Sequence, residues 1–113
     1  MKSKLFISVL VFAGLLSAGA AQEKNVRKAK NLLGKQNLTE AVTLIDAAVQ
    51  NQETASSFEA WWTRGKIYMA IPANPLLARN YANPADVAKE SLEKAAQLDP
   101  GKVLLMRQDL DRL

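Results

Sequence analysis

Along most of the chain, apolar residues recur at intervals of three and four positions, and this spacing predicts α-helices. The first predicted helix covers about residues 23–33, and a short turn over 34–37 leads to a second helix that begins at Leu38. Asn37 is expected to cap the second helix, with Glu40 three residues later in the position of a capping box. Since no run of alternating β-branched residues occurs outside the N-terminal segment, the sequence predicts an all-α fold.

Two further helices are predicted in the second half of the chain. One covers 57–71 and contains Gly65, which costs about 1 kcal/mol relative to alanine inside a helix. We therefore expect another helix to cross closely at that glycine. The other begins with Asn83 as its cap and Pro84 in the first helical position, and it ends near Leu98.

The segment between these helices, residues 72–83, is rich in proline and asparagine and contains a predicted short helical turn over 75–79. Long connections of this kind often carry binding contacts. Leu76, Leu77 and Tyr81 favour a different interpretation, in which the segment packs against the core. Both interpretations remain open at the level of the sequence.

The N-terminal segment 1–21 has the pattern of a secretory signal peptide. Lys2 and Lys4 precede an apolar run over 5–16, and small residues over 17–21 fit cleavage after residue 20 or 21. An apolar run of this length is short for a membrane span. The sequence therefore predicts an exported protein, with the periplasm as its destination. Secretion and an uncleaved segment that anchors the chain in the inner membrane are the alternatives.

Composition bears on the chemistry that the chain could perform. The chain contains no histidine and no cysteine, so it lacks the commonest general bases, thiolate nucleophiles and transition-metal ligands. No glycine-rich phosphate loop occurs either, and we expect neither enzymatic activity nor a cofactor or metal. Without Lys2 and Lys4 the net charge falls from +4 to +2, with 13 basic residues against 11 acidic ones. No basic cluster indicates a nucleic-acid partner.

Large and small residues repeat at set distances in the helical part. The second half contains Trp61, Gly65, Tyr68, Ala88, Leu92, Ala95 and Pro100. A weaker set, Ala41, Ile45 and Ala48, occurs in the first half. Both sets resemble the tetratricopeptide repeat (TPR) family, whose 34-residue unit is a helix–turn–helix. Arg64 departs from the family pattern where leucine is commonest, and the segment 72–83 is an insertion.

The resemblance implies a short right-handed α-solenoid made of two antiparallel helix pairs. The first, degenerate repeat would cover 22–56 and the second 57–101, with the insertion at 72–83. Residues 102–113 would form a C-terminal capping helix or begin a further repeat. In such a stack the small residues allow paired helices to approach, and the large ones fill the gaps between them.

The resemblance also implies a binding surface, because the first helices of stacked repeats line a concave face that holds peptides or partner proteins. In this register the residues expected there are Val26, Lys30, Leu33, Glu59, Trp62, Lys66 and Met69. Trp62 beside Lys66 would be an exposed hot spot for a peptide with an acidic group, unless another helix or the insertion covers it. The expected function is thus protein–protein interaction. An N-terminal structural fragment of a longer repeat scaffold and a membrane-anchored TPR protein are the alternatives.

Overall fold

The computed structural model of the chain describes residues 23–51, 54–102, 104, 107–108 and 111. These residues form an all-α structure without strands, as predicted. The main helices are the helical segment 23–34, α2 (Leu38–Gln50), α3 (Phe58–Ala70) and α5 (Pro84–Leu98). Shorter helical pieces are η1 (Ile71–Ala73), α4 (Pro75–Ala78) and η2 (Pro100–Lys102). The expected signal peptide, 1–21, lies outside the described residues, and so does most of 103–113.

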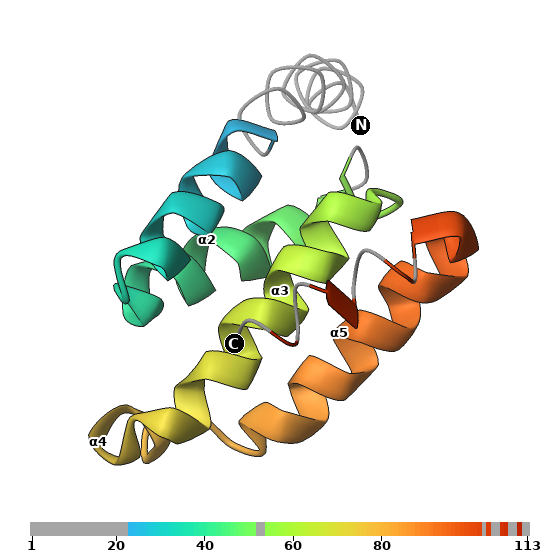
Figure 1. The fold of residues 1–113 in the computed structure, drawn as a ribbon. Coiled ribbons are helices and arrows are strands. Elements are labelled where there is room, and N and C mark those ends of the chain that lie inside the picture. The colour runs from blue at the N-terminus through green and yellow to red at the C-terminus, as the bar shows by residue number, and fades with distance from the viewer. Residues whose placement is uncertain (1–22, 52–53, 103, 105–106, 109–110, 112–113) are drawn as a thin grey trace, which may run out of the picture.

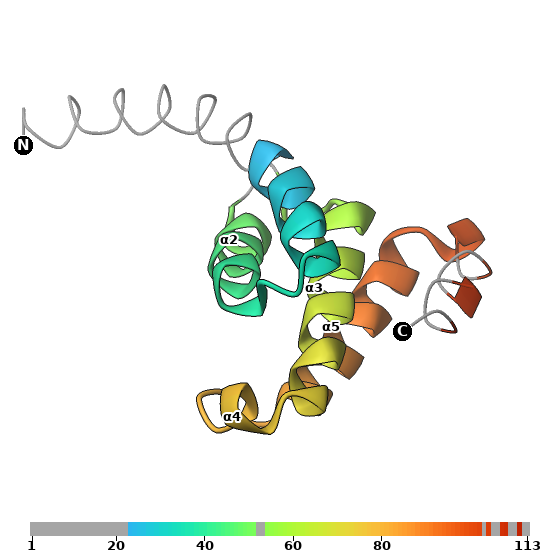
Figure 2. The ribbon, with the colours of Figure 1, turned by 60° about the vertical axis from the view of Figure 1, so that its left-hand side comes forward.

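Helix α3 occupies the centre of the fold, because it packs against α2 on one side and against α5 on another (Figure 1). The helical segment 23–34 lies beside α2 (Figure 2). Gln36, in the left-handed conformation with φ of 62°, closes the turn between them. The amide of Asn37 donates to the carbonyl of Leu32, and that of Gln36 donates to the carbonyl of Leu33, which together form a Schellman motif.

The helix starts lie where the sequence predicts them, but two of the expected caps have different chemistry. Asn37 precedes α2 without a side-chain cap bond, and its amide group instead donates to Glu40 Oε2 at 3.2 Å. Asn83 precedes α5 in the left-handed conformation, again without a side-chain cap bond. Its backbone carbonyl accepts from the amides of Asp86 and Val87. In both places the backbone carbonyl of the asparagine, and not its side chain, accepts from amides of the helix.

Small residues bring the helices close together in the core. Ala29, Ala41 and Ala48 are fully buried between the first two helices and α3. At Gly65 a Cβ atom would lie 2.5 Å from Leu92 Cδ2 and 2.7 Å from Leu92 Cγ. The helix that crosses at this glycine is therefore α5, and a side chain there would overlap with it.

The segment between α3 and α5 packs against the core with part of its apolar side chains. Asn74 caps α4 by accepting from the amide of Leu77 at 3.2 Å. Leu77 is half-buried against the core, and Tyr81 contacts the ring of Tyr68 edge-on, with 6.2 Å between the ring centroids. Leu76, in contrast, is 75% exposed. The packing interpretation thus holds for Leu77 and Tyr81 and is wrong for Leu76, which points away from the core.

Candidate binding groove

A groove of about 250 Å³ separates the helical segment 23–34 from the start of α3. Its lining residues come from the first helix, from the connection before α3 and from the first turn of α3: Glu23, Val26, Arg27, Lys30, Thr54, Ser57 and Glu59. Most of these side chains are charged or polar. The groove therefore offers both charged groups and the apolar stems of its long side chains to a ligand such as an extended peptide.

The base of the groove is held by hydrogen bonds in the connection between α2 and α3. The hydroxyl of Thr54, which is 2% exposed, donates to the carbonyl of Ala48. The hydroxyl of Ser57 accepts from the amide of Ala60 at 3.3 Å and so caps α3. Because these bonds satisfy buried or terminal polar groups, they position Glu59 in the first turn of α3.

Two of the residues expected at the binding surface meet in this groove. The ammonium group of Lys30 forms an ion pair with the carboxylate of Glu59, and the two side chains are 40% and 46% exposed. An ion pair this exposed contributes about 1 kcal/mol or less. The pair can therefore open when a ligand offers its own charged groups to either partner.

Trp62 was expected on the same surface unless another helix or the insertion covered it, and the structure shows that it is covered. Its side chain is only 4% exposed and packs with Phe58 and Ala95 in a cluster to which helix 23–34 and α2 contribute no member. The Phe58 and Trp62 rings stack with 6.3 Å between centroids. Trp61 is half-buried, and α5 covers the side of α3 that carries Trp62.

The other expected residues of α3 lie away from the groove as well. Lys66 is half-buried, and its ammonium lies 5.1 Å from the centroid of the Trp62 ring, a cation–π distance. Met69 is 39% exposed and lines a second groove near the end of α3. In the first helix, Val26 is buried at the groove wall and Leu33 lies in the core. The expected surface is thus divided: Val26, Lys30 and Glu59 line this groove, whereas Trp62 and Lys66 contact each other away from it.

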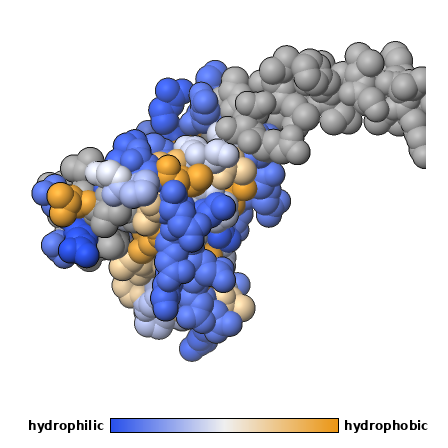
Figure 3. Space-filling view, turned by 90° about the vertical axis from the view of Figure 1, so that its right-hand side faces the viewer, coloured by the Kyte–Doolittle hydropathy of each residue, from blue (hydrophilic) through white to orange (hydrophobic). Residues whose placement is uncertain are grey.

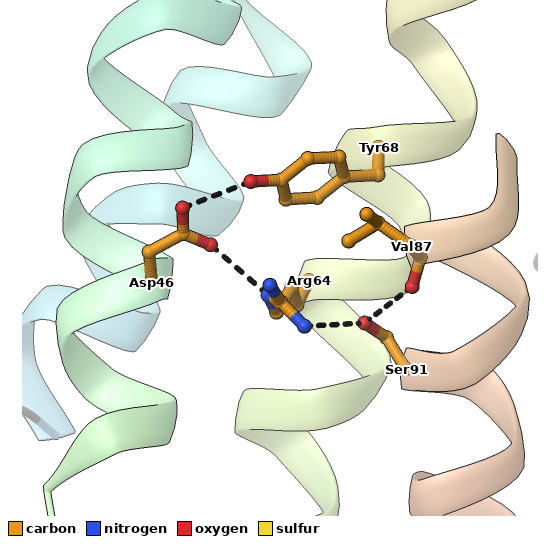
Figure 4. A network of polar contacts seen from close by, with 5 residues as sticks. All are labelled: Asp46, Arg64, Tyr68, Val87 and Ser91. Atoms are coloured by element: carbon orange, nitrogen blue, oxygen red, sulfur yellow. Dashed lines mark hydrogen bonds and ion pairs between the residues drawn. The ribbon is translucent and has the colours of Figure 1, made fainter. Parts of the chain in front are cut away.

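A polar network that the sequence analysis missed joins α2, α3 and α5 (Figure 4). Arg64 Nε donates to Asp46 Oδ1 at 3.0 Å, and Arg64 Nη1 donates to the hydroxyl of Ser91 at 3.2 Å. The hydroxyl of Tyr68 donates to Asp46 Oδ2 at 2.8 Å. Ser91, fully buried, donates in turn to the carbonyl of Val87 at 2.8 Å. Arginine at a position where the repeat pattern has leucine was the one signal in the sequence.

The network also changes the acidity of Tyr68. Burial of the phenol, together with its hydrogen bond to Asp46 and the nearby negative charge, raises the pKa of Tyr68 to about 12. The guanidinium of Arg64 lies 5.1 Å from the Tyr68 ring centroid and opposes part of this effect. Tyr68 is therefore a neutral hydrogen-bond donor at neutral pH, and the arrangement is structural in character.

Other kinds of site have little support within the described part of the chain. No group of three or more acidic side chains there could hold a metal ion. Nor does any helix in that part have the length and apolar character needed to cross a membrane.

Searches against protein-family models, curated proteins and solved structures found no match for this chain.

Proposed function

We propose that the protein is an exported, TPR-like interaction module that binds a peptide or partner protein in the groove between helix 23–34 and α3. The observation that carries this proposal is the groove itself, which is open in the isolated chain and lined by charged side chains. Since the groove exists before binding, the protein would lose little entropy on capturing a ligand.

The repeat architecture belongs to the same proposal. Two helix pairs, 23–34 with α2 and α3 with α5, would be stacked units of a short right-handed α-solenoid, with Gly65 and Ala88 at the crossing of the second pair. In that arrangement helix 23–34 and α3 are the first helices of their units, and they line the concave face. The position of the groove between these two helices supports this assignment.

Charge suggests the kind of peptide that would fit. Arg27 and Lys30 lie on one wall, while Glu59 lies on the other. An acidic side chain or a terminal carboxylate of the ligand would replace Glu59 as the partner of Lys30 and would be within the field of Arg27. Trp62 has no part in this contact, because it is buried in the cluster with Phe58 and Ala95.

The test is site-specific photocrosslinking in the native envelope, with the full-length chain expressed and exported. A photoreactive residue at position 23, an exposed position that lines the groove, should give a discrete crosslinked partner, whereas the same residue at position 50 on α2, an exposed position outside the groove, should not. Arg27→Glu should reduce the crosslink from position 23. Equal crosslinking from both positions, or none from position 23, would refute the groove. The mass of the recovered protein tests export, since cleavage predicts a chain that begins at Ala21 or Gln22.

A further inference from the structure

A second groove, of about 400 Å³, lies between the end of α3 and the first half of α5. Apolar side chains form its floor, with Met69 and Pro72 on one side and Ala88 and Leu92 on the other. Two charged residues of α5, Lys89 and Glu93, stand at its edge. Five of its seven lining residues are apolar, whereas four of the seven residues that line the first groove are charged.

This groove belongs to the side of the molecule that α2 does not cover. Arg64 and Tyr68 make the contacts of α3 with Asp46 of α2. Met69 is turned by about 100° or more from both of these residues around the helix axis. Viewed from the side of α5, the surface shows a hydrophilic band with hydrophobic areas beside it (Figure 3).

The exposed surface of the first two helices offers no counterpart for an apolar groove. Every exposed position of helix 23–34 and α2 carries a polar side chain, apart from Gly34 and Ala47. A head-to-tail contact through these two helices would therefore bring a polar surface against Met69 and Leu92. A two-fold contact instead brings two apolar grooves together, as an isologous interface requires.

We propose that a second copy of this chain occupies the groove, with the two α5 helices antiparallel across a two-fold axis that passes midway between Lys89 and Glu93. Lys89 and Glu93 are both exposed and one helical turn apart. The axis places Lys89 opposite Glu93 of the second copy, and Glu93 opposite Lys89 of the second copy. Within the described residues neither one forms an ion pair, so both charges are available. Ala85, which is exposed, allows the helices to approach closely.

Charge reversal provides the test, because both residues are exposed and their replacement leaves the core intact. Sedimentation velocity of the mature chain should show a monomer–dimer equilibrium that shifts with concentration. Lys89→Glu and Glu93→Lys should each weaken dimerisation about tenfold, because each creates two like-charge contacts across the axis. The double variant Lys89→Glu/Glu93→Lys should restore the dimer. Met69→Glu, which puts a charge on the apolar floor, should abolish it.

Lys24→Glu is the matched control, because it makes the same change of charge on an exposed position of the first helix. It should leave the dimer unchanged, and circular dichroism should be the same for all of these variants.

A monomer at every concentration up to the millimolar range would overturn the proposal and leave the groove to another partner. Self-association that survives Met69→Glu, or a double variant that fails to recover, would overturn it too. The inference does not depend on the peptide groove, since none of these residues lines that groove.

Discussion

Helix α3 is held on its two sides by different kinds of contact. Against α5 the contact is apolar and close, since Leu92 occupies the space that a side chain at Gly65 would take, and Trp62 packs beside Ala95. Against α2 the contact includes the polar network, in which both carboxylate oxygens of Asp46 accept hydrogen bonds from α3.

The two sides should respond differently to substitution. A close apolar contact depends on shape. Removing volume leaves a cavity and adding volume causes overlap, and the neighbouring side chains relax only partly in either case. The polar network is partly open to solvent, with side chains of Arg64 and Asp46 that are 20% and 34% exposed. When one partner is removed, water can therefore replace part of the hydrogen bonding that the partner provided. We expect larger losses of stability on the α5 side.

Trp62→Ala should produce the largest loss, about 3–5 kcal/mol in the free energy of unfolding, because it empties the cluster with Phe58 and Ala95. Urea unfolding followed by circular dichroism measures it. Met69→Ala, at an exposed position on the same helix, is the control and should cost far less. If Trp62→Ala leaves the unfolding midpoint unchanged, the side chain is not part of the core.

Gly65→Val should cost about 2–3 kcal/mol, because its side chain would overlap with Leu92. Leu92→Ala removes the overlapping atoms, and the double variant should therefore be more stable than the sum of the single effects allows. A coupling of about 1 kcal/mol between the two positions is expected in this double-mutant cycle. Strict additivity would mean that α5 does not approach α3 at Gly65.

Much of this apolar side could be predicted from the sequence. The spacing of apolar residues predicted the main helices. The positions of Pro84 and Pro100 predicted where α5 begins and ends. Gly65 indicated the close crossing, because a glycine inside a helix needs a compensating contact. These signals are local, and each depends on residues within a few turns of one helix.

The division of the expected binding surface could not be predicted in the same way. Spacing assigns residues to a stripe of α3, but it does not say which other helix covers that stripe. Trp62 was therefore placed in a groove, although Ala95, which is 33 positions away in the sequence, packs against it. The contact between Asp46 and Arg64 spans 18 residues, and no periodicity predicts a partner at that distance.

Asp46→Asn tests the polar side and should cost about 1–2 kcal/mol, less than either change on the α5 side. The variant keeps the shape of the side chain but removes the charge that Arg64 and Tyr68 share. Glu40→Gln is the matched control. It neutralises Glu40, which forms an exposed ion pair with Lys28 at 3.6 Å between Lys28 Nζ and Glu40 Oε1. The control should change the unfolding midpoint little. Equal effects of the two variants would show that the network contributes no more than an ordinary surface pair.

The smallest effect should appear only at high pH, through Tyr68. Its pKa in the folded chain is about 12, above the ordinary value of 10.0, so folding favours the neutral phenol. This contribution to stability is complete below pH 10 and is lost as the pH rises from 10 toward 12. Unfolding measured across that range should therefore show a decline in stability that is shallower in Tyr68→Phe.

In a Tyr81→Phe background, which leaves Tyr68 as the single tyrosine, ultraviolet titration should report the pKa of Tyr68 directly. Asp46→Asn should lower that pKa only in part, because burial is the largest cause of the shift. A Tyr68 that titrates near 10 in the folded chain would mean that the phenol is open to water and that the contact of α3 with α2 is looser than the structure shows.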